Sequence, residues 1–216
     1  MSCKLVLNSV PKDEAYKLNA QADTFLLLLC KECLAFVDGL ALSESIKEGV
    51  KLSCAKYDAF FEVGEEHSFS ILENNKLVNV IIVGCGEGSS CKPVNFRKAA
   101  GVGARALARV KANNVLLCAP ALNKASRGHY LAAACEGLLL GSYSFDKYKS
   151  DAKAPSICNV NIVSAISDAE NILQEAKIVA DSVNLVRVLC NTPGNDLNPL
   201  GMEEAARKVA EETGME

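Results

Sequence analysis

The sequence predicts an α/β domain built on a mixed, mostly parallel sheet that is flanked by helices, with a long linker helix after it. Short apolar runs alternate along the chain with longer segments in which apolar residues recur every three or four positions. Strands that alternate with helices are typical of layered α/β domains with a mostly parallel sheet. The helical pattern that begins at residue 168 is the longest in the chain and suits a rod that joins two bodies.

The strand signals are strongest in the first half of the chain. Residues 78–83 are β-branched at five of six positions, which predicts a strand. The continuous apolar run from Phe25 to Cys30, within a strand expected over 24–30, predicts burial on both faces of a sheet. Apolar and polar residues alternate over 157–165, which predicts a half-exposed edge strand. Further strands are expected over 3–7, 68–72 and 115–119.

Amphipathic spacing predicts helices over 43–53, 95–112, 127–141, 168–190 and 199–212. Asn95 is expected to be an N-cap, and Ser167 with Glu170 has the spacing of a capping box. Pro199 and Gly214 suit the start and the end of the last helix. The helix over 168–190 carries an apolar stripe formed by Ile172, Ala176, Val179, Val183 and Val186.

The turn that follows the long helix suggests where one structural unit ends and another begins. Residues 191–199 are rich in Asn, Pro and Gly, a composition that normally opens a new unit. We expect residues 1–167 to form the α/β domain, 168–190 a linker helix, and 191–216 the truncated start of a second domain. The alternative is that the long helix is one more covering helix of the first domain.

Composition narrows the class of protein. The net charge is −3, and no cluster of five basic residues suggests a nucleic-acid partner. The apolar run at Phe25–Cys30 is far shorter than the ~20 residues of a membrane span, and residues 1–8 do not resemble a signal peptide. We therefore expect a cytoplasmic protein with no nucleic-acid or membrane partner.

Cysteines are frequent, but their spacing predicts no metal or redox centre. The chain has ten, and only Cys30 and Cys33 form a C-x-x-C pair. A zinc site would need a second pair at similar spacing, and a redox pair should open a helix after a strand. We expect reduced thiols, most of them small buried hydrophobic side chains.

A glycine-rich loop is the one candidate for ligand binding. Gly84, Gly86 and Gly88 lie between a predicted strand and a predicted helix, the context in which loops bind phosphate. The spacing differs from the G-x-G-x-x-G of dinucleotide-binding loops, because the third glycine comes one residue early. A tight turn at the strand end that needs a positive φ is the favoured interpretation.

The remaining chemistry-bearing residues form no recognisable centre. His67 and His129 lie in different predicted elements and share no metal-binding spacing. No H-E-x-x-H motif or dense acidic cluster occurs. The residues by themselves therefore indicate a fold class, and we assign no catalytic or metal-binding residue to this chain.

Two segments carry a resemblance to a known family. Glu136–Ser150 matches the pattern EG-x-x-LGSY-x-FD-x-YK, and Ala180–Pro199 matches A-x-x-V-N-x-x-R-D-L-x-NTP-x-NDL-x-P. A looser match to LVGLG…LRKAG covers residues 80–101. The chain thereby resembles the leucyl (cytosol) aminopeptidases. Val188 stands where the family usually has Asp, and Gly194 where Ala is commoner.

The resemblance implies a hexameric, cytosolic hydrolase that releases N-terminal residues from peptides. In such enzymes a macro-domain-like N-terminal domain carries no catalytic residue, and a C-terminal domain holds two divalent ions (zinc, manganese or magnesium). The family's metal-site motifs, Asn-Thr-Asp-Ala-Glu-Gly-Arg and Asp-Ser-Gly-Gly, do not occur in this sequence. We therefore expect a non-catalytic part of such an enzyme, with a role in assembly and in active-site access.

Two alternatives belong to other functional classes. A macro-like module could bind a nucleotide or ADP-ribose through the loop at Gly84, Gly86 and Gly88. The chain could also be a non-catalytic partner subunit that joins full-length subunits.

Overall fold

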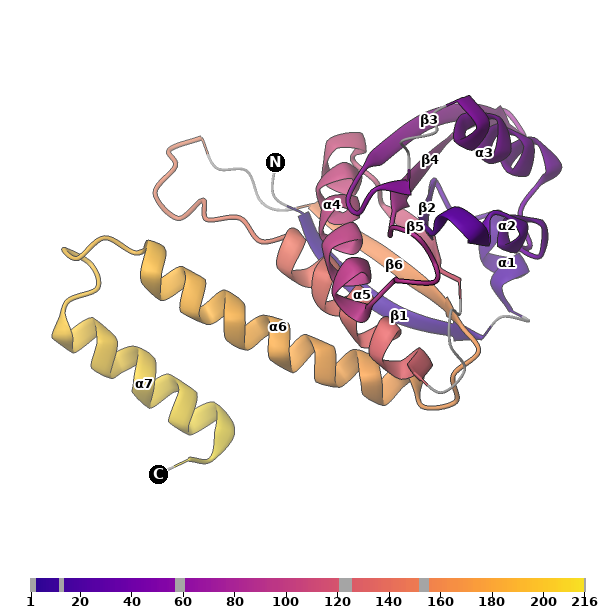
Figure 1. Ribbon diagram of the computed structural model, residues 1–216. Coiled ribbons are helices and arrows are strands. Elements are labelled where there is room, and N and C mark those ends of the chain that lie inside the picture. The colour runs from indigo at the N-terminus through magenta and orange to yellow at the C-terminus, as the bar shows by residue number, and fades with distance from the viewer. Residues whose placement is uncertain (1–2, 12–13, 57–60, 121–125, 152–155, 216) are drawn as a thin grey trace.

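The computed structural model describes residues 3–11, 14–56, 61–120, 126–151 and 156–215 (Figure 1). The strands are β1 (Cys3–Pro11), β2 (Thr24–Leu29), β3 (Glu66–Glu73), β4 (Lys76–Gly84), β5 (Asn114–Cys118) and β6 (Ser156–Ser164). The helices are α1 (Ala15–Asn19), α2 (Ala35–Asp38), α3 (Glu44–Lys56), α4 (Pro93–Val110), α5 (Arg127–Gly141), α6 (Ala169–Asn191) and α7 (Pro199–Thr213), with a 3₁₀ turn η1 at Lys31–Cys33.

The six strands form one sheet in the order β1-β6-β5-β2-β4-β3. Every neighbouring pair is parallel except β3 and β4, which form an antiparallel hairpin. Asn74 and Asn75 turn that hairpin with φ of 50° and 60°, a conformation that Asn tolerates well. The predicted mixed, mostly parallel sheet with flanking helices is confirmed.

The central strand β2 is covered on both faces, as its continuous apolar run predicts. Leu26 and Leu28 point into the core beneath α4, α5 and α6. Phe25, Leu27 and Leu29 point into a second core, which α2 and α3 cover. All five side chains are almost completely inaccessible to solvent. Alternate residues of β2 thus contribute to the cores beneath the two helical layers seen in Figure 1.

The prediction that 157–165 is an edge strand is wrong. β6 lies between β1 and β5 and pairs with both. Its alternation reflects unequal covering of the two sheet faces: Cys158, Val160 and Ile162 are buried, whereas Asn159 and Asn161 on the other face are only half-buried. Period-two alternation reports which face is covered, and it carries no information about the number of neighbouring strands.

Glycines allow α4 and α5 to pack at backbone distance. A Cβ atom on Gly137 would overlap the carbonyl oxygen of Arg97, and a Cβ on Gly141 would lie 2.5 Å from that of Gly101. The guanidinium of Arg97 also pairs with the carboxylate of Glu136 across this contact. Glycine also lets α4 pack closely on the sheet, because a Cβ atom on Gly103 would lie 2.9 Å from the Leu26 side chain of β2.

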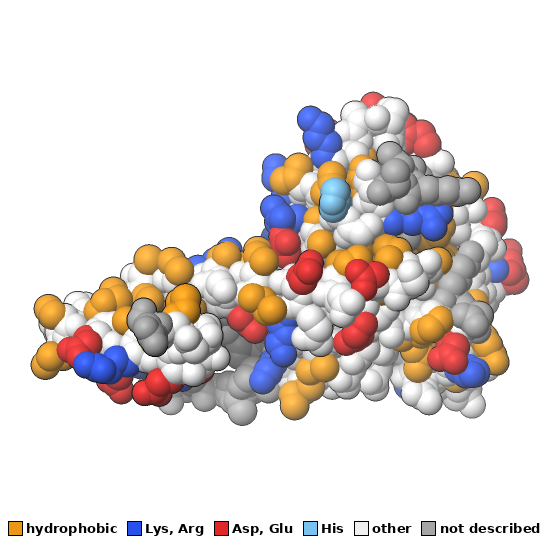
Figure 2. Space-filling view, turned by 90° about the horizontal axis from the view of Figure 1, so that it is seen from below, with side chains coloured by type: hydrophobic (Ala, Val, Ile, Leu, Met, Phe, Trp, Pro, Cys, Tyr) orange, Lys and Arg blue, Asp and Glu red, His pale blue; other side chains and the backbone are white. Residues whose placement is uncertain are grey.

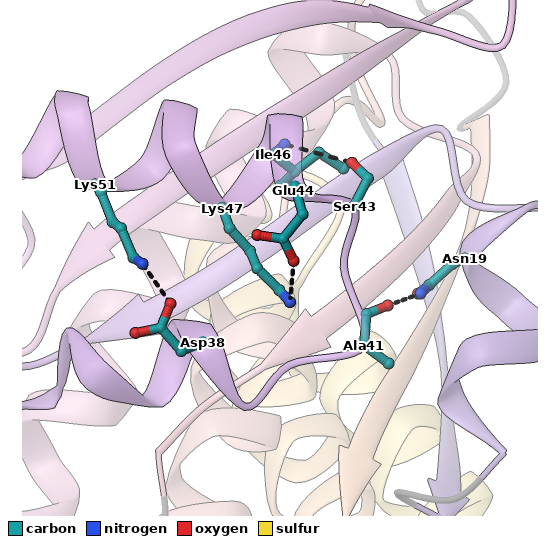
Figure 3. A network of polar contacts seen from close by, with 8 residues as sticks. All are labelled: Asn19, Asp38, Ala41, Ser43, Glu44, Ile46, Lys47 and Lys51. Atoms are coloured by element: carbon teal, nitrogen blue, oxygen red, sulfur yellow. Dashed lines mark hydrogen bonds and ion pairs between the residues drawn. The ribbon is translucent and has the colours of Figure 1, made fainter.

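Polar contacts tie together the layer on the opposite face (Figure 3). Ser43 Oγ accepts from the amide of Ile46 at the start of α3, at 3.4 Å. Lys51 of α3 pairs with Asp38 of α2. The side-chain amide of Asn19, at the end of α1, donates to the carbonyl of Ala41. The last two contacts link α1, α2 and α3, helices that are marginal in isolation.

Two predicted helix caps differ from those observed. α4 begins at Pro93 after Lys92, and the Asn95 side chain instead donates to the Cys85 carbonyl at 3.1 Å. Proline favours the first helical position because its φ is already helical, which explains the earlier start. α6 begins after Asp168, and no side-chain cap forms there, so the capping box is wrong.

The helices α6 and α7 form an arm that projects from the domain (Figure 1). The first half of α6 packs on α5 and β1 through Ala169, Leu173, Ala176 and Ala180. Beyond Ala180 no residue of α6 is buried, and α7 has no buried residue at all. Hydrophobic side chains gather along this arm in Figure 2. In the part of the chain that the structure describes, no helix is long and apolar enough to cross a membrane.

Candidate functional site

The glycine-rich loop follows β4 at the carboxyl end of the sheet. Gly84 is the last residue of β4, and Gly86 has a φ of +90°, in the region that favours glycine. Gly88 has an ordinary φ, but a Cβ atom there would lie 2.9 Å from a carboxylate oxygen of Glu32. The positive φ thus explains the glycine at 86, whereas the contact at Gly88 is with the end of a flexible side chain and does not require glycine.

The first two amides of this loop bind backbone carbonyls of the protein. The amide of Gly84 donates to the carbonyl of Glu65 at 2.9 Å. The amide of Cys85 donates to the carbonyl of Leu29 at 2.8 Å, which continues the pairing of β4 with β2. These two groups behave as an extension of the sheet and do not face an open site.

The next glycine amides are also occupied. The amide of Gly86 donates to the carbonyl of Phe61 at 2.7 Å, and that of Gly88 donates to the Glu32 carboxylate. A phosphate-binding loop needs free amides and no fixed negative charge beside them. The carboxylate of Glu32 lies where an anionic ligand would bind, so this geometry disfavours the loop as a phosphate site.

Cysteines line the inner side of this loop. Cys30, Cys85 and Cys91 are buried, and the Cys91 thiol donates to the Cys85 carbonyl at 3.3 Å. A hydrogen bond with Cys30, together with burial, raises the pKa of the Cys91 thiol. Neutral buried thiols are poor nucleophiles and poor metal ligands. Lys31 and Glu32, between Cys30 and Cys33, lie in the 3₁₀ turn η1, and the Cys33 side chain lies outside the described residues.

The described cysteines are mostly small buried side chains, as predicted. Seven of the eight whose side chains are described are buried, and Cys190 is exposed. His67 lies in β3 and His129 in α5. Among the residues that the structure describes, no group of three or more His, Cys, Asp or Glu side chains is placed to hold a metal ion.

The two segments with the strongest family resemblance meet in space. Arg187 of α6 donates from Nη1 to the carbonyl of Leu140, at the end of α5, at 2.9 Å. Its guanidinium carbon lies 5.4 Å from the ring centroid of Tyr143 and its Nη1 lies 3.3 Å from Asn184 Oδ1. A cation at this distance from an aromatic ring is attracted by the ring's negative face.

The segment after α5 also contacts the end of α6 and the turn that follows it. Asn191 Nδ2 donates to Tyr143 Oη at 3.0 Å, and Tyr148 Oη donates to the Asp196 carboxylate at 2.6 Å. We call the residues Leu140, Tyr143, Tyr148, Arg187, Asn191 and Asp196 the arm junction. The family resemblance indicated each of the two segments, but nothing in their spacing predicted that they contact each other.

The fold is shared with solved structures, one of them a leucine aminopeptidase. A tomato leucine aminopeptidase mutant superposes with a TM-score of 0.75 at 19% identity, over 97% of this chain and 43% of that chain. The bottromycin maturation enzyme BotP in complex with Mn superposes with a TM-score of 0.65 at 20% identity, over 89% of this chain and 37% of that one. At these identities the likeness shows the fold alone.

Sequence relatives carry the comparison further. A probable cytosol aminopeptidase of Solibacter usitatus (strain Ellin6076) is 33% identical over 142 residues, which is 65% of this chain and 29% of the relative. One of Clostridium perfringens (strain 13 / Type A) is 26% identical over 180 residues, 81% of this chain and 36% of the relative. This chain thus spans about a third of the length of these relatives. A family model for the N-terminal domain of the cytosol aminopeptidase family matches residues 32–152, and the chain belongs to that family.

Proposed function

We propose that this chain is the non-catalytic N-terminal part of a two-metal aminopeptidase that removes N-terminal residues from peptides in the cytoplasm. Three observations support it. The relatives are named probable cytosol aminopeptidases, and the chain spans 29% and 36% of two of them. The family's metal-site motifs are missing from the sequence. The described residues include no cluster suited to a metal ion.

The exposed arm is the observation that supports a role in assembly. Its side chains include large apolar groups in open solvent: Ile178, Val179, Val183, Val186, Leu200 and Met202. Burying apolar surface releases about 25 cal/mol for each Å², so such a strip favours association. We assign it to contacts with the catalytic part of the enzyme and with other subunits of a homo-oligomer, for which the resemblance implies a hexamer.

The arm junction supports a role in placing the catalytic part. It fixes the distal half of α6 and the turn at 191–198 against the segment that follows α5. A second body attached after α7 would then leave the first domain in a defined direction. On this view residues 1–167 are the N-terminal domain, 168–190 the linker helix, and 191–216 the beginning of the catalytic domain, and the first domain restricts access to the active site.

The metal chemistry belongs outside this chain in this proposal. Two divalent ions, zinc, manganese or magnesium, would polarise the scissile carbonyl and supply a hydroxide. The described residues offer them no ligand set, so we assign this chain no step of the reaction.

The direct test is an activity assay on the chain alone. Purified protein with added Mn²⁺ should not hydrolyse a leucyl-amide substrate, whereas a full-length cytosol aminopeptidase assayed beside it should. Metal-dependent turnover by this chain, which a chelator abolishes and which follows the protein through purification, would overturn the proposal.

A further inference from the structure

A cavity of about 440 Å³ opens at the carboxyl ends of β5 and β6. It lies apart from the glycine-rich loop, none of whose residues line it, and apart from the arm junction. The residues on its walls come from both helical layers: Phe36 and Leu40 from the α2 side, and Phe96, Leu131 and Ala134 from α4 and α5. The cavity therefore sits at the edge of the sheet, between the two layers.

The strand order explains why a hollow forms beside β5, although no residue of β2 is among the described lining residues. β2 and β5 are parallel neighbours in the sheet. After β2 the chain turns into η1 and α2, which join the core on one face, and α5, which follows β5, joins the core on the other face. Neighbouring strands whose connections leave toward opposite faces produce a crevice at their carboxyl ends. In open α/β sheets that crevice is the usual place for a ligand.

The described walls are mostly apolar. Among the described lining residues, Arg127 at the start of α5 is the only charged one. The thiol of Cys118, also on the wall, remains neutral at physiological pH because burial raises its pKa to about 12. The hydroxyl of Tyr130 already donates to the carbonyl of Cys91 at 2.8 Å. From the described lining residues, a ligand in this cavity would meet one fixed positive charge, the hydroxyl of Ser164 and mostly hydrophobic surface.

Arg127 has hydrogen-bonding capacity that the protein does not use. Its Nε atom is buried and has no hydrogen-bond partner. A buried donor without a partner is costly, and a guanidinium is charged at every pH at which the protein is folded. Carboxylates and other oxyanions are the natural acceptors for such a group.

We propose that this cavity binds a small organic anion, with its apolar body between the two helical layers and its single anionic group on Arg127. An amino acid fits less well, because no acidic side chain among the described lining residues would bind its ammonium group. A nucleoside diphosphate fits less well too, since its second charge and its polar sugars would meet apolar walls. The ligand class is therefore an aromatic or branched aliphatic carboxylate.

The test uses naphthalene-1-acetate and its neutral amide as a matched pair of probes. The protein contains no tryptophan, so naphthalene fluorescence can be followed without that background. We expect saturable binding of the acetate and about tenfold weaker binding of the acetamide, because a charge-assisted hydrogen bond is lost. Equal affinity for the two probes, or no saturable binding of the acetate, would overturn the proposal.

Two variants test separately how the charge of Arg127 and the volume of the cavity contribute to binding. Arg127→Gln should lose about tenfold in affinity for the acetate and leave the acetamide unaffected. Arg105→Gln, an exposed position on α4, is the control and should bind like the parent protein. Ala119→Leu should weaken both probes by narrowing the cavity that Ala119 lines. Because this variant keeps Arg127, it tests the site even if Arg127→Gln fails to fold, and unchanged binding by it would contradict the assignment.

Discussion

The guanidinium carbon of Arg187 lies 5.4 Å from the centroid of the Tyr143 ring, so a cation from α6 covers an aromatic ring from the segment after α5. The same guanidinium donates to the carbonyl of Leu140 at 2.9 Å. One side chain thus holds both the end of α5 and the chain that follows it. Because the distal half of α6 has no buried residue, these contacts take the place of a hydrophobic core there.

Removing that side chain should loosen the arm without unfolding the domain. Arg187→Ala eliminates a hydrogen bond to a carbonyl and a cation–π contact, which together stabilise by about 1–2 kcal/mol. Amide hydrogen exchange over residues 184–198 should accelerate about fivefold or more, while the amides of β2 stay protected. Arg207→Ala on α7, whose exposed pair with Glu203 is worth little, is the control. Equal exchange in the two variants would contradict a positioning role for Arg187.

Gly137 tests the α4–α5 contact, and Gly194, which lies outside that contact, is the matched control. Gly137→Ala places a methyl group against the backbone carbonyl of Arg97, and neither helix can move without disturbing the core beneath. We expect a loss of about 2–3 kcal/mol in the free energy of unfolding, measured by urea denaturation. A Cβ atom on Gly194 meets no atom within 4 Å, so Gly194→Ala should change stability by less than about 0.5 kcal/mol. Similar losses in the free energy of unfolding for the two variants would contradict a backbone-distance contact between α4 and α5.

The main outlines of this fold were predictable because they depend on local pattern. The run Phe25–Cys30 predicted a strand covered on both faces, and periodicity predicted α5 with its observed bounds, 127–141. α1, η1 and α2 were missed, since three to five residues are too few to show a period. The edge assignment of 157–165 failed because alternation does not reveal neighbouring strands.

The candidate sites were less predictable, because they depend on contacts between distant segments. Glu32 lies 56 residues before the Gly88 amide that it binds, and Tyr148 lies 48 before Asp196. No local pattern reports such pairs. The cavity beside Arg127 arises from the order of the strands, which local patterns do not determine. Only the resemblance indicated that residues 136–150 and 180–199 mattered.

ADP-ribose should not bind to the glycine-rich loop. The amides of Gly86 and Gly88 already donate within the protein, and the carboxylate of Glu32 would repel a diphosphate. Isothermal titration calorimetry with ADP-ribose should therefore give no heat beyond dilution. Glu32→Gln, which removes the repulsion but keeps an acceptor for the Gly88 amide, should give none either. Saturable heat with the parent protein would restore the nucleotide-binding alternative.

Stability should fall at alkaline pH because of the buried thiols. Burial raises the pKa of Cys54 to about 11 and those of Cys118 and Cys135 to about 12, from 9.0 for an unperturbed thiol. Above pH 9 the unfolded chain loses these protons while the folded chain keeps them. The stabilisation is therefore complete below pH 9 and is lost progressively as the pH rises toward 11–12. Urea denaturation at pH 8 and pH 10 should show the fall, and it should be smaller in Cys135→Ala. An identical fall in that variant would assign the effect to other groups.

The exposed arm should determine whether the chain associates with an aminopeptidase. Ile178 and Val186 are 66% and 57% exposed, so replacing both with lysine should leave the stability of the isolated chain nearly unchanged. Burying those two charges in an interface would be unfavourable, so the double variant should lose association. The measurement is size-exclusion chromatography with light scattering, on a mixture with a full-length cytosol aminopeptidase. The parent chain should co-elute with the enzyme, and so should Leu52→Lys, a position 71% exposed on α3. Co-elution of the double variant, or failure of the parent chain to co-elute, would contradict the assembly role of the arm.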